Sequence, residues 1–233
     1  MDHFTPVDTL NASNFLREVA QPDGSAVLHF LMPATGFEYN GQPVAPAGFD
    51  KEYGLYLTID ATHPAGQTGA GGIFSSLNVT LWADPKNDAG TPSVSETSGP
   101  TFSNGMANDI VLATGTMVSA SVSLDPTTMT RSADDVVTMT PTLEGTLLLD
   151  ASVKSGTLLE VKTTTPPEDF ATILQPDGST IFLVNDGTAQ ITLDPQGTIR
   201  IPNITHDQLQ LADALRFIHG NQDGHHGGDG RGR

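Results

Sequence analysis

Two stretches of the chain alternate apolar and polar residues with the period of a β-strand. Within residues 74–82, Leu77, Val79 and Leu81 fall on one face, and most residues on the other face are polar. Within residues 116–124, one face holds Val118, Ala120, Val122 and Leu124. The opposite face of that second stretch is mostly serine. One apolar and one polar face are typical of antiparallel strands, because parallel sheets are covered on both sides.

Similar patterns predict further strands along the chain. Four of these lie at residues 26–32, 51–60, 135–140 and 143–153, with Pro141 marking an edge or a bend between the last two. Three brief strands follow at residues 180–184, 188–193 and 198–201. Asp186-Gly187 and residues 194–197 separate these brief strands with the residue types of hairpin loops. Residues 11–19 are ambiguous between helix and strand.

These elements predict an all-β fold with one large unit and a smaller one. We expect an antiparallel, jelly-roll-like β-sandwich over residues 1–162, because regularly spaced strands with turn signals favour this class. Pro166-Pro167 indicates a linker at residues 163–169, and a short β-meander is expected at residues 170–204. The meander is expected to pack on the sandwich or to extend it.

A single helix is predicted near the C-terminus. Thr205 and Gln208 form a capping-box pattern, and apolar residues then recur at helical spacing, which predicts a helix over residues 205–219. The stripe formed by Leu211, Leu215 and Ile218 needs a partner surface, either on the chain's own sheet or on a second copy. Residues 220–233 contain no large apolar side chain, and we expect them to be disordered.

A five-residue sequence occurs twice. Residues 21–25 and residues 175–179 both read Gln-Pro-Asp-Gly-Ser, and each copy precedes an apolar strand. Proline fixes φ, aspartate accepts a local hydrogen bond and glycine accepts a positive φ, so the sequence is a turn signal. We interpret the repeat as shared turn chemistry and not as a duplicated domain.

Composition narrows the classes of partner. The 233 residues include 10 Lys and Arg against 27 Asp and Glu, for a net charge of −17, which disfavours nucleic acid and anionic lipid as partners. The chain has no cysteine, and no apolar run approaches the ~20 residues that span a bilayer. Residues 1–10 lack the basic and apolar regions of a secretory signal. Motifs of hydrolases, metalloproteases and nucleotide-binding enzymes are absent, so the sequence predicts no enzyme.

The aspartate and histidine residues in the predicted strands do not indicate a catalytic acid and base pair. Asp134 and Asp135 are adjacent, and neighbours in a strand point to opposite faces, so they do not form an acid and base pair. His29 lies in an apolar strand and is expected to be a hydrogen-bonded core residue.

The best ligand candidate in the sequence is calcium. Asp84, Asn87 and Asp88 supply oxygen ligands within five residues, and Asn108 and Asp109 begin the returning strand. All five could face one loop if the two strands pair. The alternative is ordinary turn chemistry, because Asp-Pro and Asn-Asp are common turn formers.

Two aromatic residues provide a candidate carbohydrate site. Trp82 lies on the polar side of its strand and Tyr56 lies on the preceding strand, so the two rings could form a stacking platform for a sugar. The alternative is that Trp82 caps a second hydrophobic cluster.

Residues 51–124 resemble a family of exported bacterial β-domains. Residues 56–60, the run from Phe74 to Asp88 and residues 107–113 are similar to flocculation-associated surface and matrix proteins of the PEP-CTERM type. These proteins carry a strand that leads into an acidic Asp-Pro-x-x-Asp loop. The resemblance implies a structural role at the cell surface or outside the cell and no catalytic residues. The chain departs from that family because it shows neither the signal peptide nor the C-terminal sorting segment.

The functional hypothesis is a non-catalytic exported or cell-surface protein that acts by self-association or adhesion. Its expected partners are itself or a surface polysaccharide, with calcium as a candidate stabilising ion. A carbohydrate-binding module is the first alternative, and a phage or capsid-like structural protein is the second.

Overall fold

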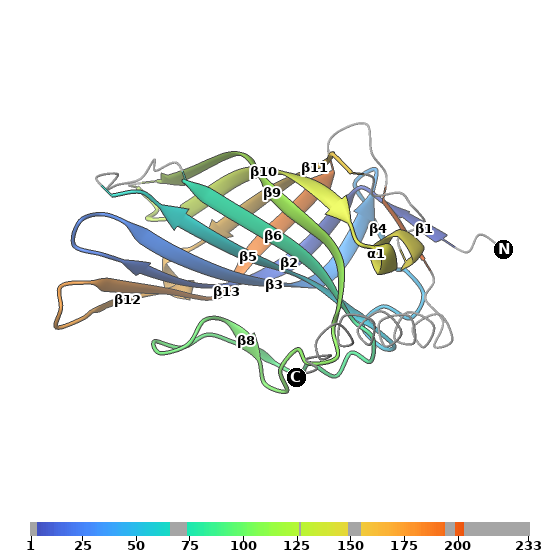
Figure 1. Cartoon of the computed structure of the whole chain (residues 1–233), viewed down its shortest axis with the longest axis horizontal. Coiled ribbons are helices and arrows are strands. Elements are labelled where there is room, and N and C mark those ends of the chain that lie inside the picture. Colours follow the sequence, from blue (N-terminus) through green and yellow to red (C-terminus); the bar gives the residue numbers. More distant parts are fainter. Residues whose placement is uncertain (1–3, 66–73, 126, 149–154, 194–198, 203–233) are drawn as a thin grey trace, which may run out of the picture.

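Eight antiparallel strands close into a β-barrel (Figure 1). The computed structural model describes residues 4–65, 74–125, 127–148, 155–193 and 199–202, and the structural statements below concern these residues. The barrel strands, in order around the wall, are β2 (Thr9–Ala20), β3 (Ala26–Tyr39), β5 (Gly54–His63), β6 (Ser76–Asp84), β9 (Ile110–Leu124), β10 (Arg131–Pro141), β11 (Thr157–Thr165) and β13 (Thr180–Leu193). Pairing of β11 and β13 closes the barrel.

Smaller elements decorate the two ends of the barrel and its outer wall. β1 (Phe4–Val7) pairs with β14 (Ile199–Pro202), and β4 (Gln42–Val44) pairs with the end of β3. β7 (Pro92–Ser93) and β8 (Thr101–Phe102) pair with each other within residues 85–109, which connect β6 to β9. The helix α1 (Leu143–Leu148) follows β10, and a 3-10 turn, η1 (Pro167–Asp169), leads from β11 into β12 (Phe170–Leu174).

The predicted β-sandwich is wrong, although the predicted all-β class is confirmed. A sandwich and a barrel both bury one face of each strand, so both produce the same alternation in the sequence. The distinction depends on whether the first and last strands meet. Here β13 pairs with β2 on one side and with β11 on the other, so residues 180–193 belong to the barrel wall. Residues 163–165 are the end of β11 and belong to the wall, and η1 follows them.

Apolar side chains fill the barrel. The largest fully buried ones in the main cluster are Leu28, Met32, Leu57, Ile59, Phe74, Leu77, Val79, Leu112 and Met139, together with Tyr53 at one end. An eight-stranded barrel is just wide enough for side chains to fill its interior. Two cavities lined by inward-facing residues measure about 30 Å³ and about 10 Å³, which is room for no more than a water molecule.

The repeated Gln-Pro-Asp-Gly-Ser sequence forms the same turn twice. Asp23 Oδ1 accepts hydrogen bonds from the Ser25 amide at 2.9 Å and from its hydroxyl at 2.7 Å. Asp177 makes the same two bonds to Ser179 at the same distances. The glycine that follows each aspartate has a φ of 84°. The interpretation as shared turn chemistry is therefore confirmed.

A β-bulge changes which residues of β9 face the core. Ser119 lies opposite Val136, whereas Met117 lies opposite Val137, so Val118 is one extra residue in β9. Val118 is 56% exposed, and Met117 packs against the main core instead. The predicted apolar face of residues 116–124 is therefore wrong at Val118.

Two other predicted elements differ from the structure. Residues 143–148 form α1 and not a strand, because the Thr142 hydroxyl accepts a hydrogen bond from the Gly145 amide at 2.9 Å and caps a helical turn. Asp186-Gly187 is not a hairpin loop but an irregularity within the single long strand β13. The predicted helix over residues 205–219 and the predicted disorder of residues 220–233 lie outside the described residues.

Only part of strand β13 pairs with β11 to close the barrel. Its second half pairs with β11, and its residues 180–184 pair with β12. β12 has no second partner strand among the described residues. The hairpin of β12 and β13 therefore extends away from the barrel beside the β2–β3 hairpin (Figure 1).

Candidate functional site

A second apolar cluster lies on the outside of the barrel. Phe15, Leu31 and Tyr56 come from the outer faces of β2, β3 and β5, and Trp82 of β6 packs beside them. The β6–β9 connection, residues 85–109, covers this cluster with Ala89, Phe102 and Met106. These outward apolar positions are therefore explained by the connection that packs over them.

Tyr56 is the centre of the outer cluster. Its ring makes an edge contact with Phe102 at a centroid distance of 5.0 Å and lies parallel to Trp82 at 6.0 Å. Its hydroxyl donates a hydrogen bond to Asp109, at the end of the connection. Burial raises the pKa of Tyr56 above its ordinary value, and the bond to Asp109 and the charge of that carboxylate raise it further. Tyr56 therefore anchors the connection as a neutral donor.

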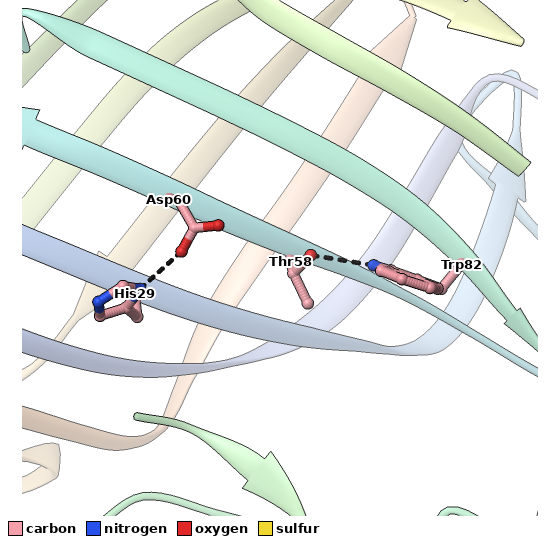
Figure 2. A network of polar contacts seen from close by, with 4 residues as sticks. All are labelled: His29, Thr58, Asp60 and Trp82. Carbon is pink, nitrogen blue, oxygen red and sulfur yellow. Dashed lines mark hydrogen bonds and ion pairs between the residues drawn. The ribbon is translucent and has the colours of Figure 1, made fainter. Parts of the chain in front are cut away.

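Polar contacts link neighbouring strands beside this cluster (Figure 2). The Trp82 indole Nε1 donates to the Thr58 hydroxyl at 2.9 Å. His29 Nδ1 lies 2.6 Å from a carboxylate oxygen of Asp60, and the two side chains are 44% and 67% exposed. The prediction that His29 is a core residue is wrong, because it lies on the outer face of β3. Its hydrogen bond was expected, but the partner is an exposed carboxylate.

The candidate calcium ligands lie in one loop and are held by internal hydrogen bonds. Asp84 is buried, and its two oxygens accept from the Lys86 amide at 3.2 Å and the Ala89 amide at 2.9 Å. The side-chain Nδ2 of Asn108 donates a hydrogen bond to Asp88 Oδ1 at 3.2 Å. Within the described part of the chain, no group of three or more His, Asp or Glu side chains is arranged to hold a metal ion. These contacts favour the turn interpretation, and calcium binding stays a prediction.

The candidate carbohydrate site does not form an open platform. Tyr56 is 1% exposed and lies beneath Phe102, and Trp82 is half-buried. The candidate self-association residues Leu211, Leu215 and Ile218 lie outside the described residues.

A groove of about 570 Å³ lies beside the outer cluster. Its floor includes Phe15, Tyr56 and Phe102, and one wall is the start of the β6–β9 connection, from Asp84 to Pro92. Asp50 and Asp186 also line the groove. Asp50 belongs to the segment before β5, and Asp186 to the irregularity in β13, so no local pattern in the sequence indicates that these two carboxylates share a surface.

A polar cluster inside the barrel was also not predicted from the sequence. Arg131 Nη1 donates to Glu18 Oε2 at 2.5 Å, and the two residues belong to strands β10 and β2, which are not neighbours in the wall. His63 packs against Phe74 with a centroid distance of 4.7 Å, and burial lowers its pKa. Asp135 is also inside the barrel and is 2% exposed, whereas Asp134 is exposed, as strand alternation predicted.

Searches against known proteins add no relative to this description. In the described residues, no helix is long and apolar enough to cross a membrane. No family model, no curated protein and no solved structure matches this chain.

Proposed function

We propose that this chain is a non-catalytic structural protein that acts by self-association, with β12 as the contact strand. The observation that carries the proposal is the free edge of β12, which pairs only with β13 among the described strands. A strand edge presents unpaired N–H and C=O groups, which form a template for another strand.

The residues of β12 leave its edge unprotected. The strand reads Phe-Ala-Thr-Ile-Leu and contains no charged residue and no proline, the residues that commonly protect strand edges. Leu174 at its end is 75% exposed. Pro167 and Pro176 flank the strand, so an added strand can pair with about five residues, which restricts the register.

A second copy of β12 is the partner that fits this edge. In an antiparallel pair related by a two-fold axis at Thr172, Phe170 of each copy lies opposite Leu174 of the other. These residues share one face of the strand, so each exposed leucine would pack against a phenylalanine. Two barrels would then share one continuous sheet.

The expected association is weak and sensitive to salt. The contact is short, and each chain carries a net charge of −17, so repulsion opposes assembly at low ionic strength. We expect dimers to form at roughly micromolar to millimolar concentrations and to become more abundant as salt is added.

Sedimentation equilibrium over this concentration range tests the proposal. The variant Leu174→Glu places two like charges at the contact and is expected to remain monomeric. Val118→Glu makes the same change at another exposed apolar position, on β9, and should associate like the wild type. A wild-type chain that stays monomeric at high concentration and high salt would refute the proposal, as would equal association of the two variants.

The cellular location and the carbohydrate-binding alternative are considered together with this proposal. The cell-surface or extracellular location implied by the family resemblance is consistent with a structural role. A carbohydrate-binding role is less well supported, because Tyr56 is covered by the β6–β9 connection. Retention of a glycan on an array, lost on replacing Trp82 by alanine, would favour that alternative.

A further inference from the structure

We propose that the outer groove binds a small organic cation of the polyamine class. The groove measures about 570 Å³, which lies within the range of small-molecule sites. This site is separate from the β12 edge, so the two proposals stand or fall independently.

The charges of the groove all have one sign. Asp50, Asp84 and Asp186 contribute carboxylates, and no Lys, Arg or His is among the described residues that line the groove. Asn87 and Asn185 add amide oxygens, which also accept hydrogen bonds from an ammonium group. The lining is therefore complementary to a cation and repels an anion.

Two of the three carboxylates are available to a ligand. Asp84 already accepts two backbone hydrogen bonds within its own loop. Asp50 and Asp186 are exposed, and neither side chain takes part in an ion pair with another described residue. Charge-assisted hydrogen bonds to ammonium groups are stronger than neutral ones, so these two carboxylates are the expected contacts.

The apolar lining of the groove requires that the cation also have an apolar body. Four apolar residues that line the groove are partly exposed, namely Pro33, Ala34, Phe49 and Pro92. A hydrated metal ion leaves this apolar surface in contact with water, whereas the methylene chain of a polyamine covers it. Carboxylates from separate segments suit a ligand with more than one ammonium group.

Three polar residues of the groove have left-handed backbone conformations. Asp50, Asn87 and Asp186 have φ values of 62°, 50° and 69°, in the left-handed region that is uncommon for residues other than glycine. Gly54 lies against Asn87, because a Cβ atom at Gly54 would be 2.8 Å from Asn87 Oδ1. A methyl group at residue 54 would therefore displace the Asn87 side chain at the groove.

Isothermal titration calorimetry with spermidine at physiological salt tests the proposal. We expect saturable binding by the wild-type chain and a loss of about tenfold or more in affinity for the double variant Asp50→Asn/Asp186→Asn. The control Asp134→Asn/Glu160→Gln removes the same charge from β10 and β11 and should bind like the wild type. The neutral diol 1,8-octanediol should not bind.

Two results would overturn the proposal. Absence of saturable spermidine binding by the wild-type chain is the first. An equal loss of affinity in both double variants is the second, because it would show general attraction to a negatively charged protein. Gly54→Ala gives an independent check, since it changes the groove without changing charge and should also weaken binding.

Discussion

Replacing Asp135 by asparagine should remove a pH-dependent weakness of the barrel. Asp135 is buried between β9 and β11, where its neighbours across the strands are Ala120 and Val161. Burial raises the pKa of its carboxyl from 3.8 to about 7, and the charge of Asp134 adds to this effect. Its Oδ1 atom makes no hydrogen bond within the described residues.

The direction of the pH dependence follows from the raised pKa. The folded chain binds this proton up to about pH 7, whereas the unfolded chain releases it near pH 3.8. The stability of the fold therefore falls as pH rises from about 4 to about 7 and is constant with respect to this group above that. The difference between 3.8 and about 7 corresponds to about 4 kcal/mol at 1.36 kcal/mol per pKa unit.

Urea unfolding of the wild type and Asp135→Asn at pH 4.5, 6 and 8 measures this effect. The two lower pH values lie within the range from about 4 to about 7 over which the stability falls, and the highest lies above it. We expect the two proteins to be similar at the lowest pH, and the variant to be more stable by up to about 4 kcal/mol at the highest. The control Asp134→Asn alters an exposed carboxyl and should change stability much less. A stability difference between Asp135→Asn and the wild type that does not change with pH would refute the reasoning.

Three further substitutions test the contacts that hold the barrel and its outer connection. Glu18→Gln leaves Arg131 without its counter-charge and should cost about 3 kcal/mol in urea unfolding, near the low end for buried pairs because the Arg131 side chain is 22% exposed. Tyr56→Phe removes the buried hydroxyl donor and should cost about 1 to 3 kcal/mol, with faster proteolysis within residues 85–109; unchanged proteolysis would contradict the anchoring role. Gly145→Ala places a methyl group against the Leu112 carbonyl and should lower the free energy of unfolding by about 1 to 3 kcal/mol, whereas unchanged stability would show that α1 does not dock as described.

Local patterns in the sequence predicted six of the eight barrel strands, because each strand has one face in the core. Residues 11–19, within β2, were ambiguous, and β11 was not predicted. The strands around Val79 and Leu57 lie where the alternation places them. The turns at Asp23 and Asp177 were also predicted, since their hydrogen bonds are made within a few residues. These strands and turns could be predicted because their patterns are local, whereas the local hydrogen bond that caps α1 was missed and residues 143–148 were predicted to be a strand.

Barrel closure and the polar sites could not be predicted, because they depend on contacts between distant segments. The barrel closes where β11 pairs with β13, and the local sequence of neither strand indicates the register of that pair. Glu18 and Arg131 are 113 residues apart and meet only because the barrel closes. The extra residue at Val118 is hidden within a regular alternation, so only the pairing with β10 identifies it. Asp50 and Asp186 likewise meet at one groove from opposite ends of the sequence.

A cysteine cross-link at Thr172 tests the proposed self-association most directly. The chain has no cysteine, so Thr172→Cys introduces a single thiol into each copy. In the proposed pair, residue 172 of each copy lies opposite its equivalent, at a Cα separation of about 4.5 to 5.5 Å, which a disulfide can span. We expect mild oxidation to give a covalent dimer with Thr172→Cys and little dimer with the exposed control Val118→Cys. Equal cross-linking of both variants, or none in either, would contradict assembly through β12.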